Sequence, residues 1–276
     1  MFGIHKRIIL CHQLNFSIKP FLKCSSFLPE LLNHHLPQRR SVSSSCHPLE
    51  YELIEQEHYD QVLEHLRRNF FLDEPTNKAA DLCQNGSPCT HPELEQKALE
   101  TMPDHLSLMA VETQQDCSKI AGVVLNGILR DGDTVKALKD LDRSCDLGYR
   151  KMFTMIYSFN IKNDLFKEFA VDRIFDVRVL SVDSSYRGRG IANELVKQSV
   201  ALAKQKGFSL LKTDATGIFS QKIFKSLGFE VFAEQPYDKY MDDDGQIILP
   251  VEAPHTKLQL LYKKMCKGTE NEQGKK

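Results

Sequence analysis

The sequence predicts a fold of the α/β (α+β) class, in which one sheet is built together with several helices. Short runs of β-branched and aliphatic residues, typical of strands, recur along the chain. Segments with apolar residues three and four positions apart, typical of amphipathic helices, lie between these runs. We therefore expect one domain of interleaved strands and helices over residues 48–267.

The composition sets limits on size and partners. The chain has 276 residues, of which 41% are hydrophobic, and this suits one domain with extensions. The formal net charge of -1 gives no general attraction to nucleic acid, so we expect no nucleic-acid partner. No apolar run approaches the roughly 20 residues of a membrane span, so we expect no membrane partner either.

The cysteines indicate neither a metal nor a disulfide framework. There are eight of them, and none forms a C-x-x-C pair. Cys83, Cys89 and His91 lie near one another, but their spacing fits no common zinc pattern. We expect free thiols in a reducing compartment and no bound metal.

The two ends of the chain differ from the middle in composition. Residues 1–47 carry six Lys and Arg residues against one acid, Glu30, and are rich in serine. This is typical of a mitochondrial transit peptide, and a disordered extension without an address fits as well; a secretory signal fits worse. The expected location is therefore the cytoplasm or the mitochondrion. Residues 268–276 form a polar tail.

The first half of the domain predicts strands around one long helix. Residues 51–54 have the pattern of a strand, and 57–70 that of a helix with one apolar face. A proline follows Glu74 and disfavours helix there, so we expect this residue where the helix gives way to a loop. Two further strands, joined by a polar turn as a hairpin, cover 106–111 and 120–127.

The second half begins with an unusually long connection. Residues 131–172 contain helical patterns, and we expect an inserted helical segment that roofs a substrate pocket. The remaining elements alternate, with strands at 177–182, 208–213, 229–233 and 257–265, and helices at 190–206 and 220–227.

The strand at 177–182 leads into a glycine-interrupted turn and then a helix. The turn contains Arg-Gly-Arg-Gly at 187–190. The first N–H groups of a helix have no partner within it and carry the positive end of its dipole, so this arrangement suits an anion such as a phosphate. The spacing is not that of G-x-x-x-x-G-K-[ST]. A G-x-G-x-x-G would need a third glycine at Asn193.

This string resembles the acetyl-coenzyme A motif Q/R-x-x-G-x-G/A of the GNAT superfamily of N-acetyltransferases. The resemblance implies a mixed, mostly antiparallel central sheet with helices on both faces and a helical insertion before the central strand. It also implies acetyl-CoA as co-substrate. The residues placed against acetyl-CoA are Leu180, Ser181, Val182, Arg187, Gly188, Arg189, Gly190, Ile191 and Ala192.

Further motifs narrow the resemblance. Phe-Phe-Leu-Asp-Glu-Pro at 70–75, the helix before Phe229, and Pro-His at 254–255 look like those of the insect-type arylalkylamine N-acetyltransferases. The resemblance makes Glu74 the general base, Ser220 the acid or proton relay, and Thr216 a second relay hydroxyl. On the substrate side it places Asp73, Asp176 and His255. Many GNAT enzymes have a tyrosine acid at the position of Phe224, so its absence favours the insect type.

The implied activity is acetyl transfer from acetyl-CoA to the primary amine of an arylalkylamine such as dopamine, serotonin, tyramine or octopamine. The enzyme would be a monomer whose partners are small molecules. Two alternatives stay open: an acyltransferase for polyamines, other small amines or longer acyl-CoA, and a module that binds acyl-CoA without catalysis.

Several of these residues also have purely structural interpretations. Glu74 can be a solvated charge at a helix end, and Ser220 only the N-cap of its helix. Asp176 can be an exposed strand residue, and His255 a structural one. An aromatic-ring pocket is expected from composition alone, and its candidate lining residues are Phe70, Phe71, Met152, Met155 and Phe159.

Overall fold

A computed structural model of the chain describes residues 48–114 and 117–265. The predicted leader, residues 1–47, and the predicted tail, residues 268–276, lie outside the described residues. The strands are β1 (Leu49–Leu53), β2 (Leu108–Gln114), β3 (Cys117–Arg130), β4 (Arg173–Val182), β5 (Leu210–Ala215), β6 (Glu230–Pro236) and β7 (Lys257–Lys264). They form one sheet with the order β1-β2-β3-β4-β5-β7-β6. All neighbours are antiparallel except β4 and β5, which confirms the expected mixed, mostly antiparallel sheet.

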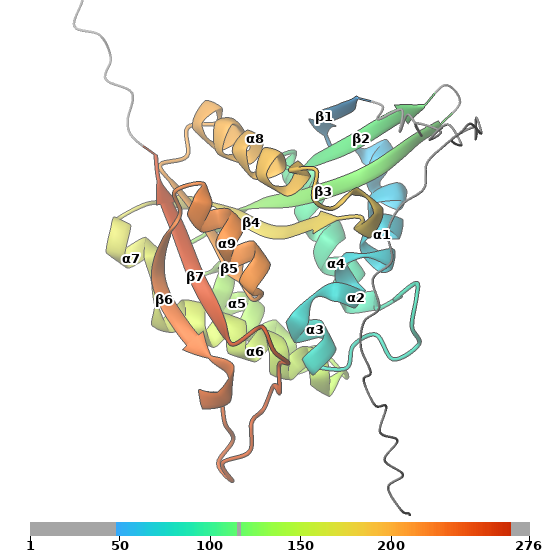
Figure 1. Ribbon diagram of the computed structural model, residues 1–276. Helices are drawn as coiled ribbons and strands as arrows, with labels where there is room; N and C mark the ends of the chain where they lie inside the picture. Colours follow the sequence, from blue (N-terminus) through green and yellow to red (C-terminus); the bar gives the residue numbers. More distant parts are fainter. Residues whose placement is uncertain (1–47, 115–116, 266–276) are drawn as a thin grey trace, which may run out of the picture. The chain divides into compact units, whose positions relative to one another are not determined.

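Helices cover both faces of this sheet (Figure 1). They are α1 (Tyr59–Arg68), α2 (Phe70–Asp73), α3 (Pro75–Ala79), α4 (Pro92–Thr101), α5 (Asp133–Asp140), α6 (Leu147–Lys162), α7 (Leu165–Phe169), α8 (Ile191–Gln205) and α9 (Ile218–Ser226). Short 3-10 helices are η1 (Gln56–His58), η2 (Met102–Asp104), η3 (Leu141–Arg143), η4 (Ser184–Tyr186) and η5 (Tyr237–Lys239). Among the described residues, no helix has the length and apolar character needed to cross a membrane.

The two faces follow from the two-residue period of the strands. On β2, Met109 and Val111 pack in one core cluster with α1, α4 and α6. Their neighbours Leu108 and Ala110 point to the opposite face and pack in a second cluster with α8 and α9. Successive side chains of a strand alternate between the faces, so a strand buried on both sides reads as a continuous apolar run. This explains the apolar patterns of the central strands.

The central strands β4 and β5 separate after a short contact. Their register joins Phe175 to Leu211 and Asp176 to Lys212, and no further pair follows. Strand β4 nevertheless continues to pair with β3 as far as Val182. Within the part of the chain that the structure describes, the edge of β4 that faces β5 therefore has no strand beside it beyond Val177.

The predicted helical insertion is present between β3 and β4. It consists of α5, α6 and α7. Helix α6 buries Tyr149, Met152, Met155 and Phe159, which lie three or four residues apart and so share one face. This face packs into the same cluster as α1 and α4. The insertion thereby covers one side of the sheet near the point where β4 and β5 separate.

The expected loop after Glu74 is wrong. Glu74 has an extended backbone between α2 and α3, and Pro75 is the first residue of α3. Proline is well suited to this position because its missing N–H would have no helical partner anyway. The carboxylate of Glu74 accepts the N–H of Asn77 and so caps the N-terminus of α3. The proline thus starts a helix where we expected it only to end one.

The expectation of free thiols is wrong for one pair of cysteines. Cys83 and Cys89 form a disulfide in the loop between α3 and α4, with their Cα atoms 5.2 Å apart. Cys145 is free and exposed. A disulfide requires its Cα atoms to lie within about 4.4–6.8 Å, and this depends on how the loop turns back on itself. The backbone N–H of Cys89 donates to the carbonyl of Arg67, which helps to fix that turn.

Candidate active site

A cavity of about 660 Å³, here called the α8 cavity, lies where the free edge of β4 meets the N-terminal ends of α8 and α9. Eight of the nine residues predicted to contact acetyl-CoA line it, namely Leu180, Ser181, Val182, Arg187, Gly188, Gly190, Ile191 and Ala192. The ninth, Arg189, does not line the cavity. Its guanidinium packs on the ring of Tyr186, and its Nη1 lies 3.5 Å from Oε1 of Glu112. The local string therefore folds into one concave surface.

The glycines of the turn have the backbone conformation that the sequence suggested. Gly190 is the N-cap of α8 with φ of +78°, and Gly188 has φ of +80°. A Cβ atom at either position would meet no atom within 4 Å, so backbone conformation rather than space favours glycine here. In residues 48–114 and 117–265, no side chain caps the first N–H groups of α8, and these groups border the cavity. This end of the cavity suits an anion.

Arg187 is held at the rim of the α8 cavity. Its guanidinium donates to the carboxylate of Asp73 and, through Nε at 3.3 Å, to the carbonyl of Val182. Asp73 is about half exposed and also has an ion pair with Lys78 at 3.9 Å. Asp73 was predicted on the substrate side. The structure places it at the rim of the α8 cavity. It does not line the other cavity of the site, the α6 cavity described below.

A second cavity of about 280 Å³, here called the α6 cavity, lies between α2, α4, α6 and the strands β4 and β5. Phe70, Phe71 and Met152 line it, as the composition suggested. Met155 and Phe159 lie on the buried face of α6 and do not line the cavity. Its volume is just below the range of roughly 300–1,000 Å³ for small-molecule sites.

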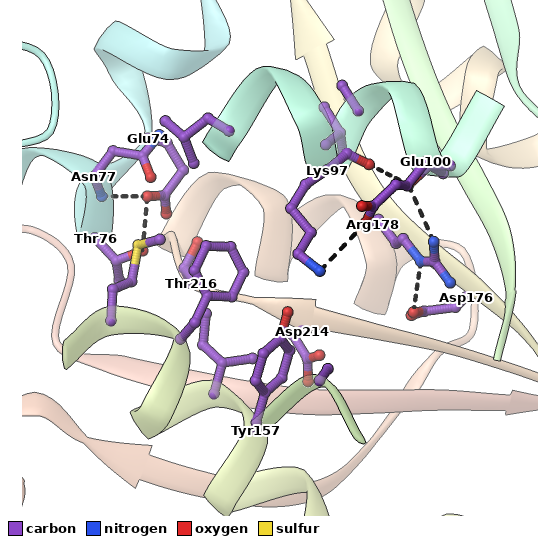
Figure 2. Close-up of a pocket in the computed structure, with 18 of the residues that line it drawn as sticks. Glu74, Thr76, Asn77, Lys97, Glu100, Tyr157, Asp176, Arg178, Asp214 and Thr216 are labelled. Carbon is purple, nitrogen blue, oxygen red and sulfur yellow. Dashed lines mark hydrogen bonds and ion pairs between the residues drawn. The ribbon is translucent and has the colours of Figure 1, made fainter. Parts of the chain in front are cut away.

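The two cavities meet at Glu74. Only Phe70, Glu74 and Thr216 line both of them among the described residues. Glu74 is 8% exposed, so it is not the solvated helix-end charge of the structural alternative. Its Oε2 accepts the hydroxyl of Thr76 at 2.7 Å and the N–H of Asn77 at 2.5 Å (Figure 2). Its Oε1 is buried and has no hydrogen-bond partner among the described residues.

The turn between β5 and α9 carries the predicted hydroxyls. Ser220 lies in the first turn of α9 and donates to the carbonyl of Gly217 at 2.9 Å, so it is not the N-cap. Gly217 is the N-cap. His255 supplies the capping interaction instead, because its Nδ1 accepts the N–H of Ile218 at 3.1 Å. Both Ser220 and His255 line the α8 cavity.

Thr216 is anchored through its backbone. Its carbonyl accepts the hydroxyl of Tyr237 at 2.7 Å. Tyr237 is 3% exposed, and burial together with the nearby charge of Glu74 raises its pKa, which keeps this hydroxyl neutral. Tyr237 was not singled out by the sequence analysis. An isolated tyrosine in a strand-end turn was its only signal.

Asp176 is buried rather than exposed, which excludes the structural alternative for it. Its carboxylate contacts Nε of Arg178 at 3.1 Å and Nζ of Lys212 at 3.6 Å. Lys212 also pairs with Asp214 at 2.7 Å. Burial opposes the charge of Lys212, but the two carboxylates outweigh it and raise the pKa of the lysine. Asp176, Arg178 and Asp214 all line the α6 cavity.

Comparisons with known proteins agree with this geometry. Residues 156–229 match the model of the acetyltransferase (GNAT) family. The structure of arylalkylamine N-acetyltransferase 2 from Aedes aegypti is 44% identical in sequence, with a TM-score of 0.74, over 78% of this chain and 98% of that one. A polyamine N-acetyltransferase from Drosophila melanogaster is 16% identical, covers 79% of this chain and all of that one, and has a TM-score of 0.69, so it shows the fold alone.

A shorter sequence match is to N-acetylaspartate synthetase from Xenopus tropicalis. It is 39% identical over 61 residues, which are 21% of this chain and 22% of that protein. The chain thus spans about a fifth of that relative. The high identity and nearly full coverage of the mosquito enzyme decide the family, and they confirm the resemblance expected from the sequence. The chain belongs to the GNAT superfamily of acyl-CoA-dependent N-acetyltransferases and, within it, to the insect-type arylalkylamine N-acetyltransferases.

Proposed function

We propose that this chain transfers the acetyl group of acetyl-CoA to the primary amine of an arylalkylamine of the dopamine, serotonin, tyramine and octopamine class. The observation that carries the proposal is the meeting of the two cavities at Glu74 and Thr216. The α8 cavity offers a strand edge and a helix N-terminus, which suit a phosphorylated, amide-containing donor. The α6 cavity is lined by aromatic and aliphatic side chains, which suit an aryl group.

The donor would bind along β4. In the proposal, the pyrophosphate lies on the N–H groups at the start of α8. The amides of the pantetheine arm pair with the free edge of β4 near Leu180 and Val182, as an added strand would. This direction brings the thioester to the junction of the two cavities, beside Glu74.

The amine must lose a proton before it attacks. A free alkylamine has a pKa of roughly 10.4, so only a small fraction is neutral at pH 7. The unpartnered Oε1 of Glu74 is the acceptor for this proton, directly or through one water. The nitrogen then forms a bond to the thioester carbon, and the C–S bond breaks. The nitrogen passes its second proton through Ser220 or Thr216 to the thiolate of CoA, and Glu74 releases the first proton to water.

The direct test is an assay of thiol release with a panel of amines and acyl donors. Arylalkylamines with acetyl-CoA should be turned over with higher kcat/KM than diamines, polyamines or longer acyl-CoA. A protein that binds acetyl-CoA and acetylates no amine would instead be the non-catalytic module. Turnover of polyamines without any turnover of aryl amines would assign the chain to the other substrate class.

The role of Glu74 is tested by Glu74→Gln, which keeps the shape of the side chain. We expect kcat/KM at pH 7 to fall by roughly 10²–10⁴, the range for a positioned base. Between pH 7 and pH 9 the remaining activity should rise about tenfold per pH unit, because the free amine must then form in solution. Acetyl-CoA affinity, measured by calorimetry, should stay unchanged.

Glu64→Gln is the matched control for this experiment. Glu64 lies on α1, is partly exposed, and pairs with Arg68 outside both cavities. The control should keep the activity and pH profile of the wild type. A Glu74→Gln enzyme with the same pH profile as the control would remove Glu74 as the base.

A further inference from the structure

The end of the α6 cavity away from Glu74 is polar but has little unpaired charge. Figure 2 shows Glu74 and Thr76 on one side of the pocket, and Asp176, Arg178 and Glu100 on the other. Three carboxylates at this second side each have a cation close by. The pairs are Asp176 with Arg178 at 3.1 Å, Asp214 with Lys212 at 2.7 Å, and Glu100 with Lys97 at 3.4 Å.

This pairing argues against a second ammonium group on the substrate. A diamine or polyamine that places one nitrogen at Glu74 would bring its other charge into the polar end. That charge would have to leave water, and it needs an unpaired carboxylate in exchange. The remaining carboxylate that lines the cavity, Asp133, already accepts the N–H of Arg130 at an exposed position. The polar end therefore favours a neutral group.

Tyr157 supplies a free hydroxyl at this end. It rises from α6, and Figure 2 shows its hydroxyl pointing into the pocket near Asp214. Among the described residues this hydroxyl has no hydrogen-bond partner. Burial raises the pKa of Tyr157, so the hydroxyl stays protonated and able to donate. No feature of the mechanism at Glu74 uses it.

Asp214 supplies the complementary acceptor. Its Oδ1 accepts one hydrogen bond from Asn160 at 2.9 Å, and its Oδ2 accepts one from Lys212 at 2.7 Å. An ionised carboxylate has about four acceptor sites, so two of them remain. Its side chain is 20% exposed and borders the cavity. Tyr157 and Asp214 together therefore offer one donor and one acceptor, and a hydroxyl group needs both.

Much of the remaining lining of the cavity is apolar and includes Phe70, Phe71, Met152, Phe153 and Ile156. The cavity thus combines the carboxylate of Glu74 on one side, apolar walls, and a donor–acceptor pair on the other side.

We propose that Tyr157 and Asp214 recognise a hydroxyl group on the ring of the acceptor amine, and that they select ring-hydroxylated arylalkylamines over unsubstituted ones and over diamines. The inference rests on the proposed function and specifies its substrate class. An unsubstituted ring would leave the hydroxyl of Tyr157 without a partner and the two remaining acceptor sites of Asp214 unused once water is expelled, and this penalty supplies the selectivity.

The test compares phenethylamine, tyramine and the diamine cadaverine as acceptors with saturating acetyl-CoA. For the wild type we expect kcat/KM for tyramine to exceed that for phenethylamine by roughly tenfold to 100-fold, with cadaverine lowest. Tyr157→Phe should reduce the tyramine-to-phenethylamine ratio to below about threefold, because kcat/KM for tyramine falls with the lost hydrogen bond and kcat/KM for phenethylamine rises once no hydroxyl is left unpaired.

Tyr149→Phe is the matched control. Tyr149 is a buried tyrosine on the same helix, and it lines neither cavity. Its removal should leave the substrate ratio at the wild-type value, so a general loss of packing in α6 is separated from a loss of hydroxyl recognition.

The other possible results show whether the ring-hydroxyl inference fails alone or together with the proposed acetyltransferase function. A wild type that acetylates tyramine and phenethylamine equally well, or a Tyr157→Phe enzyme that keeps the full ratio, overturns the inference and leaves the proposed function intact. Preference for cadaverine over tyramine also overturns the inference. If no aryl amine is acetylated at all, the proposed function fails and the inference fails with it.

Discussion

Nε2 of His65 on α1 lies 3.0 Å from the hydroxyl of Ser181 on β4, and both side chains are buried. The contact joins the helix that precedes Glu74 to the strand that borders the α8 cavity. Burial is the main cause that lowers the pKa of His65 to about 4, so the ring is neutral near pH 7. This pair could not be predicted from the sequence, because 116 residues separate its members.

This pair makes the stability of the fold dependent on pH. The unfolded histidine has a pKa of about 6.5, so between pH 6.5 and pH 4 the unfolded chain binds more protons than the folded one. Stability is therefore full above about pH 7 and falls as the pH decreases through this window. We expect the free energy of unfolding in urea to be roughly 2 kcal/mol lower at pH 5 than at pH 7.5.

A pair of variants isolates the contribution of His65. His65→Gln keeps a polar side chain but has no imidazole to titrate. Between pH 7.5 and pH 5 the variant should therefore lose less stability than the wild type, and the difference should be most of the roughly 2 kcal/mol. His105→Gln, at an exposed position, should behave as the wild type does. Equal pH slopes in all three proteins would show that His65 is not the group responsible.

Ser220→Ala tests the proposed relay to the leaving thiolate. A thiol has a pKa of about 8.5, so its anion leaves fairly well even without a proton donor. We therefore expect kcat to fall only about tenfold, less than the usual range for a lost general acid. Ser226→Ala on the same helix is the control and should keep its kcat, because Ser226 is outside both cavities. An unchanged kcat in Ser220→Ala would remove this hydroxyl from the relay.

Gly190→Ala tests the anion site at α8. The left-handed conformation costs a non-glycine residue roughly 1–2 kcal/mol, so stability should fall by about this amount. The backbone can also relax away from this conformation, which misplaces the N–H groups and raises KM for acetyl-CoA. Gly245→Ala is matched to it, since Gly245 has φ of +75°, also has open space around it, and lies in a distant turn. It should show a similar stability loss with KM unchanged; a raised KM in both variants would contradict the assignment.

Reduction of the Cys83–Cys89 disulfide should destabilise the protein. The bond closes a short loop between α3, which carries Thr76 and Asn77, and α4, which lines the α6 cavity. We expect a loss of roughly 2–4 kcal/mol in the free energy of unfolding, both in Cys83→Ser and in wild type treated with a thiol reductant. Cys145→Ser should have no such effect. If the reductant exposes no additional thiols in a titration, the disulfide is not formed in solution.

The parts of the site that a short string encodes could be predicted from the sequence. The strand, the two glycines and the start of α8 are contiguous, and each follows from local backbone rules. The mixed, mostly antiparallel sheet followed from the family resemblance, and the helical insertion was also indicated by the patterns at 131–172; both are confirmed. The catalytic roles of Glu74, Ser220 and Thr216 remain predictions for the experiments above.

The parts that depend on distant contacts could not be predicted. Periodicity identified the apolar face of α6 but gave no way to separate Met155, which lies in the core, from Tyr157, which lines the cavity. That distinction depends on where β4 and β5 leave a gap beside the helix. The pairing of Asp176 with Lys212 likewise requires the two strands to be neighbours in register. The carboxylate of Glu74 was identified, while its place between two helices was not.

The early separation of β4 from β5 makes the stability of the folded protein depend on the concentration of acetyl-CoA. If acetyl-CoA pairs with the free edge of β4 as proposed, its pantetheine arm adds hydrogen bonds to the sheet that the protein alone does not make. A ligand that binds only the folded chain stabilises it by about 2.7 kcal/mol at a concentration 100 times its Kd. The lifetime of this enzyme in a cell would then follow the supply of its own acetyl donor, and starvation for that donor would leave a less stable protein.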